Sequence, residues 1–341
     1  LANQGSWSSF KLLGYVDLPM AAPSSVSASS NGWWESPGTT GGKALSQIDP
    51  SEESIRQLLW DGDWQGVVAT KGYAIVASKQ ENKVCFVDLS PLFAYIRQSY
   101  FSSVSSFRNT LSARGSGSTQ FPKTFSALSS IKPKVVYTTS VSRPTAVLAG
   151  VKLNRWTQDR HKAYVASEDG TITIFDTSSL KKRWDYEKLG SLQKMGTFKV
   201  GKNPVSMAFM RYSESGVPLV PKNSDGTTAL DPLNGMFYVA CRGDRELDGV
   251  VSFGSSGTVY RRIQDKRMGD PVAVAVADRA NVVSVADFNG KKIVSFRVGN
   301  LTDVDNGKTY GCGPNGTDKF EFAGELKFSG HPFLVGSSNV N

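Results

Sequence analysis

Four segments of the chain share one pattern, and this repetition constrains the fold more than any other feature of the sequence. Each segment has a run of β-branched and apolar residues, then a polar turn with Gly, Asp or Asn, then a second, alternating run. Because a period of two places alternate side chains on one face of a strand, the pattern predicts a β-hairpin. The predicted hairpins are residues 72–89, 161–177, 235–253 and 280–298.

Further strand-like runs flank these hairpins. The runs before the hairpins are residues 65–71, 144–153, 204–212 and 271–278. The runs after the last three hairpins are residues 195–200, 258–263 and 320–328. Each later run leads into a Gly-x-Pro or Gly-x-x-Pro turn that ends at Pro204, Pro271 or Pro332. Proline suits such a turn because it fixes φ and has no N–H for a ladder. The repeating unit is therefore predicted to be four antiparallel strands that follow a proline turn.

The second copy of the unit resembles a known repeat. Tyr164-Val-Ala-Ser167, Ile172-Thr-Ile-Phe-Asp176 and Val200-Gly-Lys-Asn-Pro204 are similar, in order, to the two strands and the re-entry turn of YVTN-type β-propeller repeats. The resemblance implies an all-β fold, a β-propeller of four-stranded antiparallel blades, with about four blades visible. Partial terminal strands are predicted at residues 9–21 and 330–336.

The repeats do not fill the chain. We predict that residues 1–341 form a single β-propeller that is part of a larger one, with further blades supplied by missing sequence or by another chain. The stretches that break the pattern are the inserts 24–62, 89–134, 213–234 and 299–317. Apolar spacing predicts an amphipathic helix at 91–111, and a capped short helix is predicted from Ser51. Inserts of this kind lie on propeller faces, where binding usually resides.

Net charge and hydropathy limit the classes of partner that the chain can have. The formal net charge of +9 favours acidic partners, so a binding module for acidic ligands is one hypothesis. Lys and Arg are spread along the chain and form no single patch. This favours the interpretation that they are solvated residues at strand edges, and it makes nucleic-acid binding the less favoured alternative. No apolar stretch is long enough to span a membrane. The chain starts at Leu1 and carries sequons at 300–302 and 315–317, which predicts an extracellular, cell-surface or periplasmic protein whose leader has been removed, or an excised fragment.

Residues with catalytic or metal-binding chemistry are few. The two histidines, His161 and His331, exclude a multi-histidine copper or zinc site. No G-x-S-x-G elbow occurs, so no serine triad is identified and the catalytic residues stay unknown. Asp303, Asp305 and Asn306 precede a glycine, and this alternation of oxygens fits half of a Ca²⁺ loop. An ordinary turn rich in Asp and Asn is the alternative.

Two short motifs are candidates for interaction. Arg242 and Asp244 flank Gly243 in an RGD tripeptide, which can serve adhesion when exposed and is also ordinary turn chemistry. Trp33 and Trp34 are either an exposed aromatic pair at an interface or a cap on the core beneath an insert.

The repeats, the inserts and the scarcity of histidine favour one function class. We predict a non-enzymatic extracellular propeller, a structural or protein-interaction module of a surface or multi-subunit assembly with other protein subunits as partners. Because lactonases also use such propellers, a lactonase-like hydrolase with a central Ca²⁺ is the second hypothesis. Binding of acidic ligands is the third. Repeats of this kind indicate a fold and do not identify a function.

Overall fold

The computed structural model describes most of the chain. The described residues are 11–30, 49–62, 64, 69–114, 122–150, 162–182, 185–189, 191–210, 213–214, 235–253, 255–277, 282–297, 301–302, 309–310 and 321–336.

Sixteen strands form four antiparallel sheets of four strands each, which we call blades 1 to 4. Blade 1 contains β1 (Ser25–Ser30), β2 (Gly72–Ser78), β3 (Lys83–Asp88) and β4 (Lys134–Ser140). Blade 2 contains β5 (Pro144–Ala149), β6 (Lys162–Ser167), β7 (Thr171–Asp176) and β10 (Lys194–Lys199). Blade 3 contains β11 (Pro204–Met210), β13 (Gly235–Cys241), β14 (Glu246–Phe253) and β15 (Ser256–Ile263). Blade 4 contains β16 (Pro271–Ala277), β17 (Val282–Asp287), β18 (Lys292–Arg297) and β21 (Glu321–Lys327).

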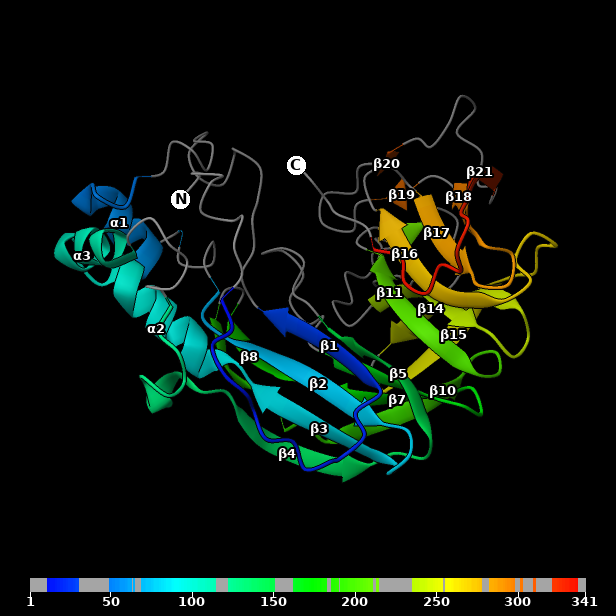
Figure 1. Cartoon of the computed structure of the whole chain (residues 1–341), viewed down its shortest axis with the longest axis horizontal. Coiled ribbons are helices and arrows are strands. Elements are labelled where there is room, and N and C mark those ends of the chain that lie inside the picture. Colours follow the sequence, from blue (N-terminus) through cyan, green and yellow to red (C-terminus); the bar gives the residue numbers. More distant parts are fainter. Residues whose placement is uncertain are drawn as a thin grey trace, which may run out of the picture.

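The first strands of successive blades lie beside one another. β1 contacts β5, β5 contacts β11, and β11 contacts β16, so the blades follow one another around an arc (Figure 1). Hydroxyl groups bridge these inner strands: the N–H groups of Val147 and Ala149 donate to Ser25 Oγ and Ser27 Oγ at 3.2 and 2.9 Å. Four-stranded antiparallel blades with adjacent inner strands define an all-β propeller.

The core lies between the blades. The middle strands of blades 2 and 3 are buried on both faces, because each of these blades packs between two others, and they are accordingly apolar on both faces. Aromatic side chains fill the boundary between blades 2 and 3, where the ring centroids of Tyr164 and Phe237 are 4.6 Å apart. The four predicted hairpins are confirmed as β2–β3, β6–β7, β13–β14 and β17–β18.

Helices occupy part of the first two inserts. The predicted short helix is α1 (Glu53–Trp60), and it packs against α2 (Ser90–Phe101) through Ile55, Leu59 and Phe101. The single helix predicted at 91–111 is wrong, because a second helix, α3 (Val104–Arg114), starts after a break. Ser103 causes the break by accepting the backbone N–H of Ser106 at 3.0 Å, which is the hydrogen bond of a helix N-cap.

Smaller elements complete the fold. A 3₁₀ turn, η4 (Ser129–Ile131), precedes β4. A hairpin of β8 (Ser178–Lys182) and β9 (Asp185–Leu189) leaves blade 2 between β7 and β10. A small sheet of β12 (Ser213–Glu214), β19 (Leu301–Thr302) and β20 (Thr309–Tyr310) joins the inserts 213–234 and 299–317. The described residues contain no helix that is long and apolar enough to cross a membrane.

The N-terminal part differs from the prediction. The first strand of blade 1 is β1, so assigning that place to residues 65–71 is wrong, and the insert 24–62 contributes a strand to the blade. Residues 11–21 contain no strand, although a closing strand was predicted at 9–21. They instead cover the outer face of blade 1. Val16, Leu18 and Met20 form one hydrophobic cluster there with Val76, Cys85 and Val87 of the blade.

Strand direction places the inserts. In each blade the first-to-second and third-to-fourth connections leave at one end, because consecutive strands are antiparallel. The breaks after β1, β3, β11 and β18 are all connections of this kind, so the described ends of these connections lie at one face, which we call the insert face. The tight hairpin turns and the proline turns lie at the opposite face, the turn face.

Candidate interaction surface

One interaction recurs at the turn face: a carboxylate at the hairpin turn accepts backbone N–H groups of the proline turn of the same blade. In blade 1, Glu81 Oε2 accepts the N–H groups of Ala21 and Ala22 at 2.9 and 3.1 Å, just before Pro23. In blade 4, Asp287 Oδ1 accepts the N–H of Asp270 at 2.8 Å. These bonds fix the chain where it starts each blade. They also lower the pKa of Glu81, chiefly through the N–H of Ala22.

Ion pairs join neighbouring blades at this face. Glu168, in the hairpin turn of blade 2, binds Lys79 of blade 1 at 2.9 Å and also pairs with Arg143. These two cations, Arg143 first, lower the pKa of Glu168 to about 2. Arg242 of blade 3 forms a two-pronged ion pair with Asp270 of blade 4 at 2.5 and 3.0 Å. The blade boundaries are therefore charge-matched at the turn face.

Both charged residues of the RGD tripeptide contact their own chain. Arg242 binds Asp270, and Asp244 Oδ2 accepts the backbone N–H of Lys202 at 2.7 Å. Because both groups help to join the hairpin turn to adjacent turns, the structure gives them a local role. Their role in adhesion stays a prediction.

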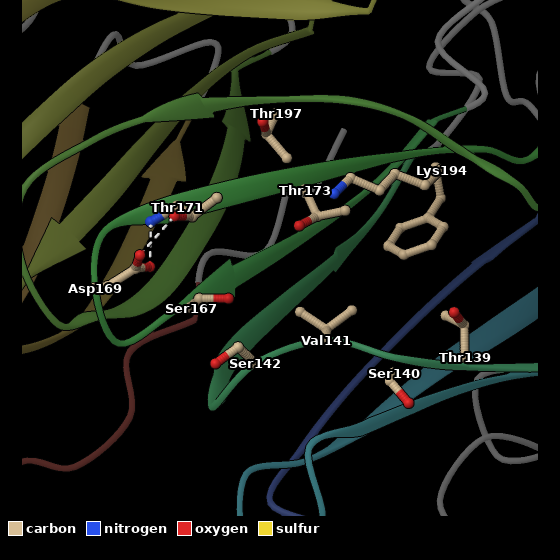
Figure 2. A pocket seen from close by; sticks show the side chains of 11 residues that line it. Thr139, Ser140, Val141, Ser142, Ser167, Asp169, Thr171, Thr173, Lys194 and Thr197 are labelled. Carbon is tan, nitrogen blue, oxygen red and sulfur yellow. Dashed lines mark hydrogen bonds between the residues drawn. The ribbon is translucent and has the colours of Figure 1, made fainter.

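A polar pocket of about 200 Å³ lies between blades 1 and 2 (Figure 2). Seven of the eleven lining residues carry hydroxyls, and the only charged ones are Asp169 and Lys194. Asp169 turns back to accept hydrogen bonds from the N–H and the hydroxyl of Thr171, each at 2.9 Å (Figure 2). Lys199 and then Thr171 lower the pKa of Asp169 to about 2. The lining offers hydrogen bonds to a hydroxyl-bearing ligand and places no paired acid and base together.

Blade 4, at the end of the arc, has a face on which no other described blade packs. Cross-strand register places Ala273, Ala286, Ile293 and Leu326 in one row across this face. The opposite face of the same sheet packs on blade 3. Val335 packs on Ala273 and Ala286 at the inner end of the row, while Leu326 is 61% exposed at the outer end. We call this row the free face of blade 4.

The segment after β21 follows the inner strands. Residues 331–336 form no strand, but Val335 packs against Val272 and Ala273 of β16 and Ala286 of β17. Phe333 and Leu334 are 75% and 80% exposed. Adjacent exposed apolar residues of this kind indicate a contact surface.

The remaining predicted site residues have separate places. Trp33, Trp34, Asp303, Asp305 and Asn306 lie outside the described residues, so the aromatic pair and the Ca²⁺ loop stay predictions. His331 directly follows the bend at Ser329 and Gly330, beside the predicted Gly-x-Pro turn. Its Nδ1 is 2.8 Å from the carbonyl oxygen of Phe288, and its ring stacks on that side chain.

Sequence reasoning missed one buried cluster. Cys241, Glu246 and Asp248 bring a thiol and two carboxyl groups within 4.8 Å of one another in blade 3. Cys241 lies in a predicted apolar strand, where a cysteine is usually a core residue, and neither Glu246 nor Asp248 was among the predicted site residues. The available signal was the spacing Cys241-x₄-Glu246-x-Asp248 across a predicted hairpin, which becomes a cluster only in one register.

No family model matches the chain, and no curated protein matches it. Hydrazine synthase of Kuenenia stuttgartiensis is similar at 12% identity and a TM-score of 0.36, over 92% of this chain and 53% of that one. Sqt1 of Chaetomium thermophilum, bound to the N-terminus of ribosomal protein L10, has 11% identity and a TM-score of 0.37, over 78% and 48%. Apo AztD of Citrobacter koseri has 10% identity and a TM-score of 0.33, over 78% and 47%.

The chain spans about half the length of these structures. The TM-scores are low, so the likeness carries no argument about function. The propeller assignment depends on the strand order and the adjacent inner strands of the chain itself.

Proposed function

We propose that the chain is a structural or protein-interaction module whose free face on blade 4 receives a β-sheet of another subunit. The observation that carries the proposal is the row ending at Leu326. The equivalent side of each earlier blade packs on the next blade, whereas the outer end of this row is exposed. A partner with an apolar sheet face would continue an interface that the chain already makes three times.

The inner strands indicate what such a partner needs. Val274 N–H of blade 4 donates to Ser206 Oγ of blade 3 at 3.1 Å, so one blade offers hydroxyls to the backbone of the next. A sheet with a Ser- or Thr-bearing inner strand and an apolar face would satisfy both requirements. Phe333 and Leu334 precede Val335, which packs at the inner end of the row. They are exposed and add apolar contact area.

Two finer assignments belong to this proposal. We assign the repeats to the YVTN type, which is supported by the turn from Val200 to Pro204 whose Gly201 N–H is held by Asp248. We also assign the protein to an extracellular, cell-surface or periplasmic location, which is supported by the two sequons.

Site-specific photocrosslinking tests the interface. A photoreactive phenylalanine replaces Leu326 in the full chain, and the matched control replaces Val136, an exposed residue on the outer strand of blade 1. We expect crosslinks from position 326 to a β-strand of a different polypeptide in the assembly from the native source. Crosslinks to a second copy of this chain would show a homo-oligomer. Absence of crosslinks at 326, with crosslinking at 136, contradicts the proposal.

A charge substitution gives an independent readout. Leu326→Glu should lower the mass of the assembly in light scattering, because a carboxylate opposes burial of the row. Leu12→Glu, at a residue that is 67% exposed in the N-terminal segment, should leave the mass unchanged. Circular dichroism checks that both variants stay folded.

A further inference from the structure

We propose that Cys241, Glu246 and Asp248 form a buried binding site for a divalent transition-metal ion, with Zn²⁺ as the preferred ion. All three side chains come from the β13–β14 hairpin, and the register pairs Cys241 directly with Glu246. None of the three residues is more than 3% exposed. Their donor atoms lie within 4.8 Å of one another, so a single ion can reach all of them after small side-chain rotations.

The separation of the donor atoms suits tetrahedral coordination. Cys241 Sγ is 3.7 Å from Asp248 Oδ2. Zinc bonds to sulfur at about 2.3 Å and to carboxylate oxygen at about 2.0 Å, which at a tetrahedral angle places the two donors about 3.5 Å apart. Three protein ligands leave one position for a water molecule or for a second carboxylate oxygen.

An unpartnered oxygen points to a missing ligand. Asp248 is fully buried, and its Oδ1 has no hydrogen-bond partner among the described residues. Buried carboxylate oxygens are normally satisfied, because an unmade bond leaves the cost of desolvation uncompensated. A cation at the cluster would supply the missing interaction.

A glycine keeps space beside the cluster. A Cβ on Gly201 would collide with Glu246 Oε1 and would lie 3.1 Å from Cys241 Sγ. The same glycine donates its N–H to Asp248 Oδ2 at 2.8 Å. It therefore leaves room between two of the proposed ligands and orients the third.

Polar groups around the carboxylates resemble an outer coordination shell. Arg262 Nη1 donates to Glu246 Oε1 at 3.1 Å, and Gln264 Nε2 donates to Oε2 at 3.2 Å. Ligating carboxylates are commonly held by hydrogen bonds of this kind, which fix their orientation.

Two of the other blades, 1 and 4, carry a cation at the equivalent place. The residue opposite Ser78 in blade 1 is Lys83, and the residue opposite Asp287 in blade 4 is Lys292. Lys83 lies 3.9 Å from Glu81, the carboxylate that holds the proline turn. In blade 3 the corresponding residue is Glu246, so this hairpin has an acid where blades 1 and 4 have a lysine.

The donor set selects the metal. A thiolate is a soft ligand that Zn²⁺ accepts and that Ca²⁺ and Mg²⁺ avoid. Binding requires the thiol and both carboxyls to lose their protons to solvent. Without the ion, burial and the neighbouring carboxyl raise the pKa of Glu246, and burial raises the pKa of Asp248 and of Cys241. Protons then take the place of the cation, and affinity for the metal should fall as the pH falls.

Cobalt substitution tests the site directly. The full chain is stripped with a chelator and titrated with Co²⁺, whose bond to a thiolate gives a near-ultraviolet charge-transfer band. We expect about one Co²⁺ per chain and displacement of the band by Zn²⁺. Cys241→Ser should abolish the band, and Glu246→Gln should weaken binding by about ten-fold or more. Cys85→Ser, at the other fully buried cysteine, is the matched control and should keep the band.

Two results overturn the assignment, namely no band in the wild-type chain and a band that persists in Cys241→Ser. In the second case, loss of the band in Cys312→Ser would show that Cys312 supplies the thiolate. Zinc-dependent protection from thermal unfolding gives a second readout, since an ion that binds only the folded state raises Tm. That protection should vanish in Cys241→Ser and remain in Cys85→Ser.

Discussion

Glu168 shows how one side chain joins two blades. It accepts Lys79 from blade 1 and Arg143 from the turn before β5, so its carboxylate sits between two cations. The sequence shows these residues only as separate charges about 25 to 89 positions apart. Their meeting depends on the packing of one hairpin turn against the next proline turn, which no local pattern encodes.

Low pH should weaken the ion pairs of Glu168 with Lys79 and Arg143. The pKa of Glu168 is lowered from 4.5 to about 2, so its stabilising contribution is present above pH 4.5 and is lost as the pH falls toward 2. Glu168→Gln should therefore flatten the decrease of unfolding free energy over this interval, measured by urea titration at several pH values. Glu321→Gln, on exposed β21, is the control. An unchanged pH dependence in Glu168→Gln would show that the ion pairs contribute nothing.

The residue scale also shows why the buried cluster escaped prediction. A cysteine in an apolar strand is more often a core residue than a ligand. Only the register that pairs Cys241 with Glu246 brings the acids to the thiol, and a shift of one residue would turn Glu246 to the other face. Composition and spacing could suggest the three residues but could not establish their contact.

Among the elements, the hairpins were predictable because their strands are apolar or alternating and their turns carry Gly, Asp or Asn. β1 was missed because its sequence, Ser-Val-Ser-Ala-Ser-Ser, places hydroxyls against the backbone of β5. β4 was missed because it follows a long insert and alternates exposed and half-buried residues. The helix at 91–111 was predicted as one element because a serine N-cap inside an apolar pattern is a weak signal.

The turn between β6 and β7 requires glycine. Gly170 has a φ of +82°, and a Cβ there would lie 2.6 Å from the carbonyl oxygen of Val200 in the next proline turn. Gly170→Ala should lower the free energy of unfolding by about 1–2 kcal/mol from conformation alone, with the close contact adding to that. Gly324→Ala, where nothing lies within 4 Å, is the control in a urea titration. Equal stability of the two variants would refute this account of the turn.

For the whole molecule, the sequence predicted the propeller but not the shape of its ends. The repeated strands established four-stranded blades, and the described blades number four. The covering of blade 1 by residues 11–21 could not be foreseen, because Val16, Leu18 and Met20 alternate as strand residues do. Their alternation was interpreted as a closing strand, whereas they pack on a sheet face without joining its ladder.

Position in the arc should determine local stability. Blades 2 and 3 have a neighbour on each side, while β21 is almost entirely exposed at the end. We expect the amides of β6 and β13 to exchange most slowly with deuterium and those of β21 much faster, because local opening costs least where few contacts are lost. Hydrogen-exchange mass spectrometry on the full chain measures this. Protection of β21 equal to that of β13 would contradict the packing described.

The long connections leave the blades at one face, and the short turns whose length must stay constant lie at the other. Changing the length of a connection on the turn face would displace a proline turn and the carboxylate that holds it. The connections at the insert face leave and rejoin a single blade, and β12 pairs with β19 between two of them. Grafted peptides, affinity tags or whole domains therefore belong in a connection at this face that leaves β12, β19 and β20 intact.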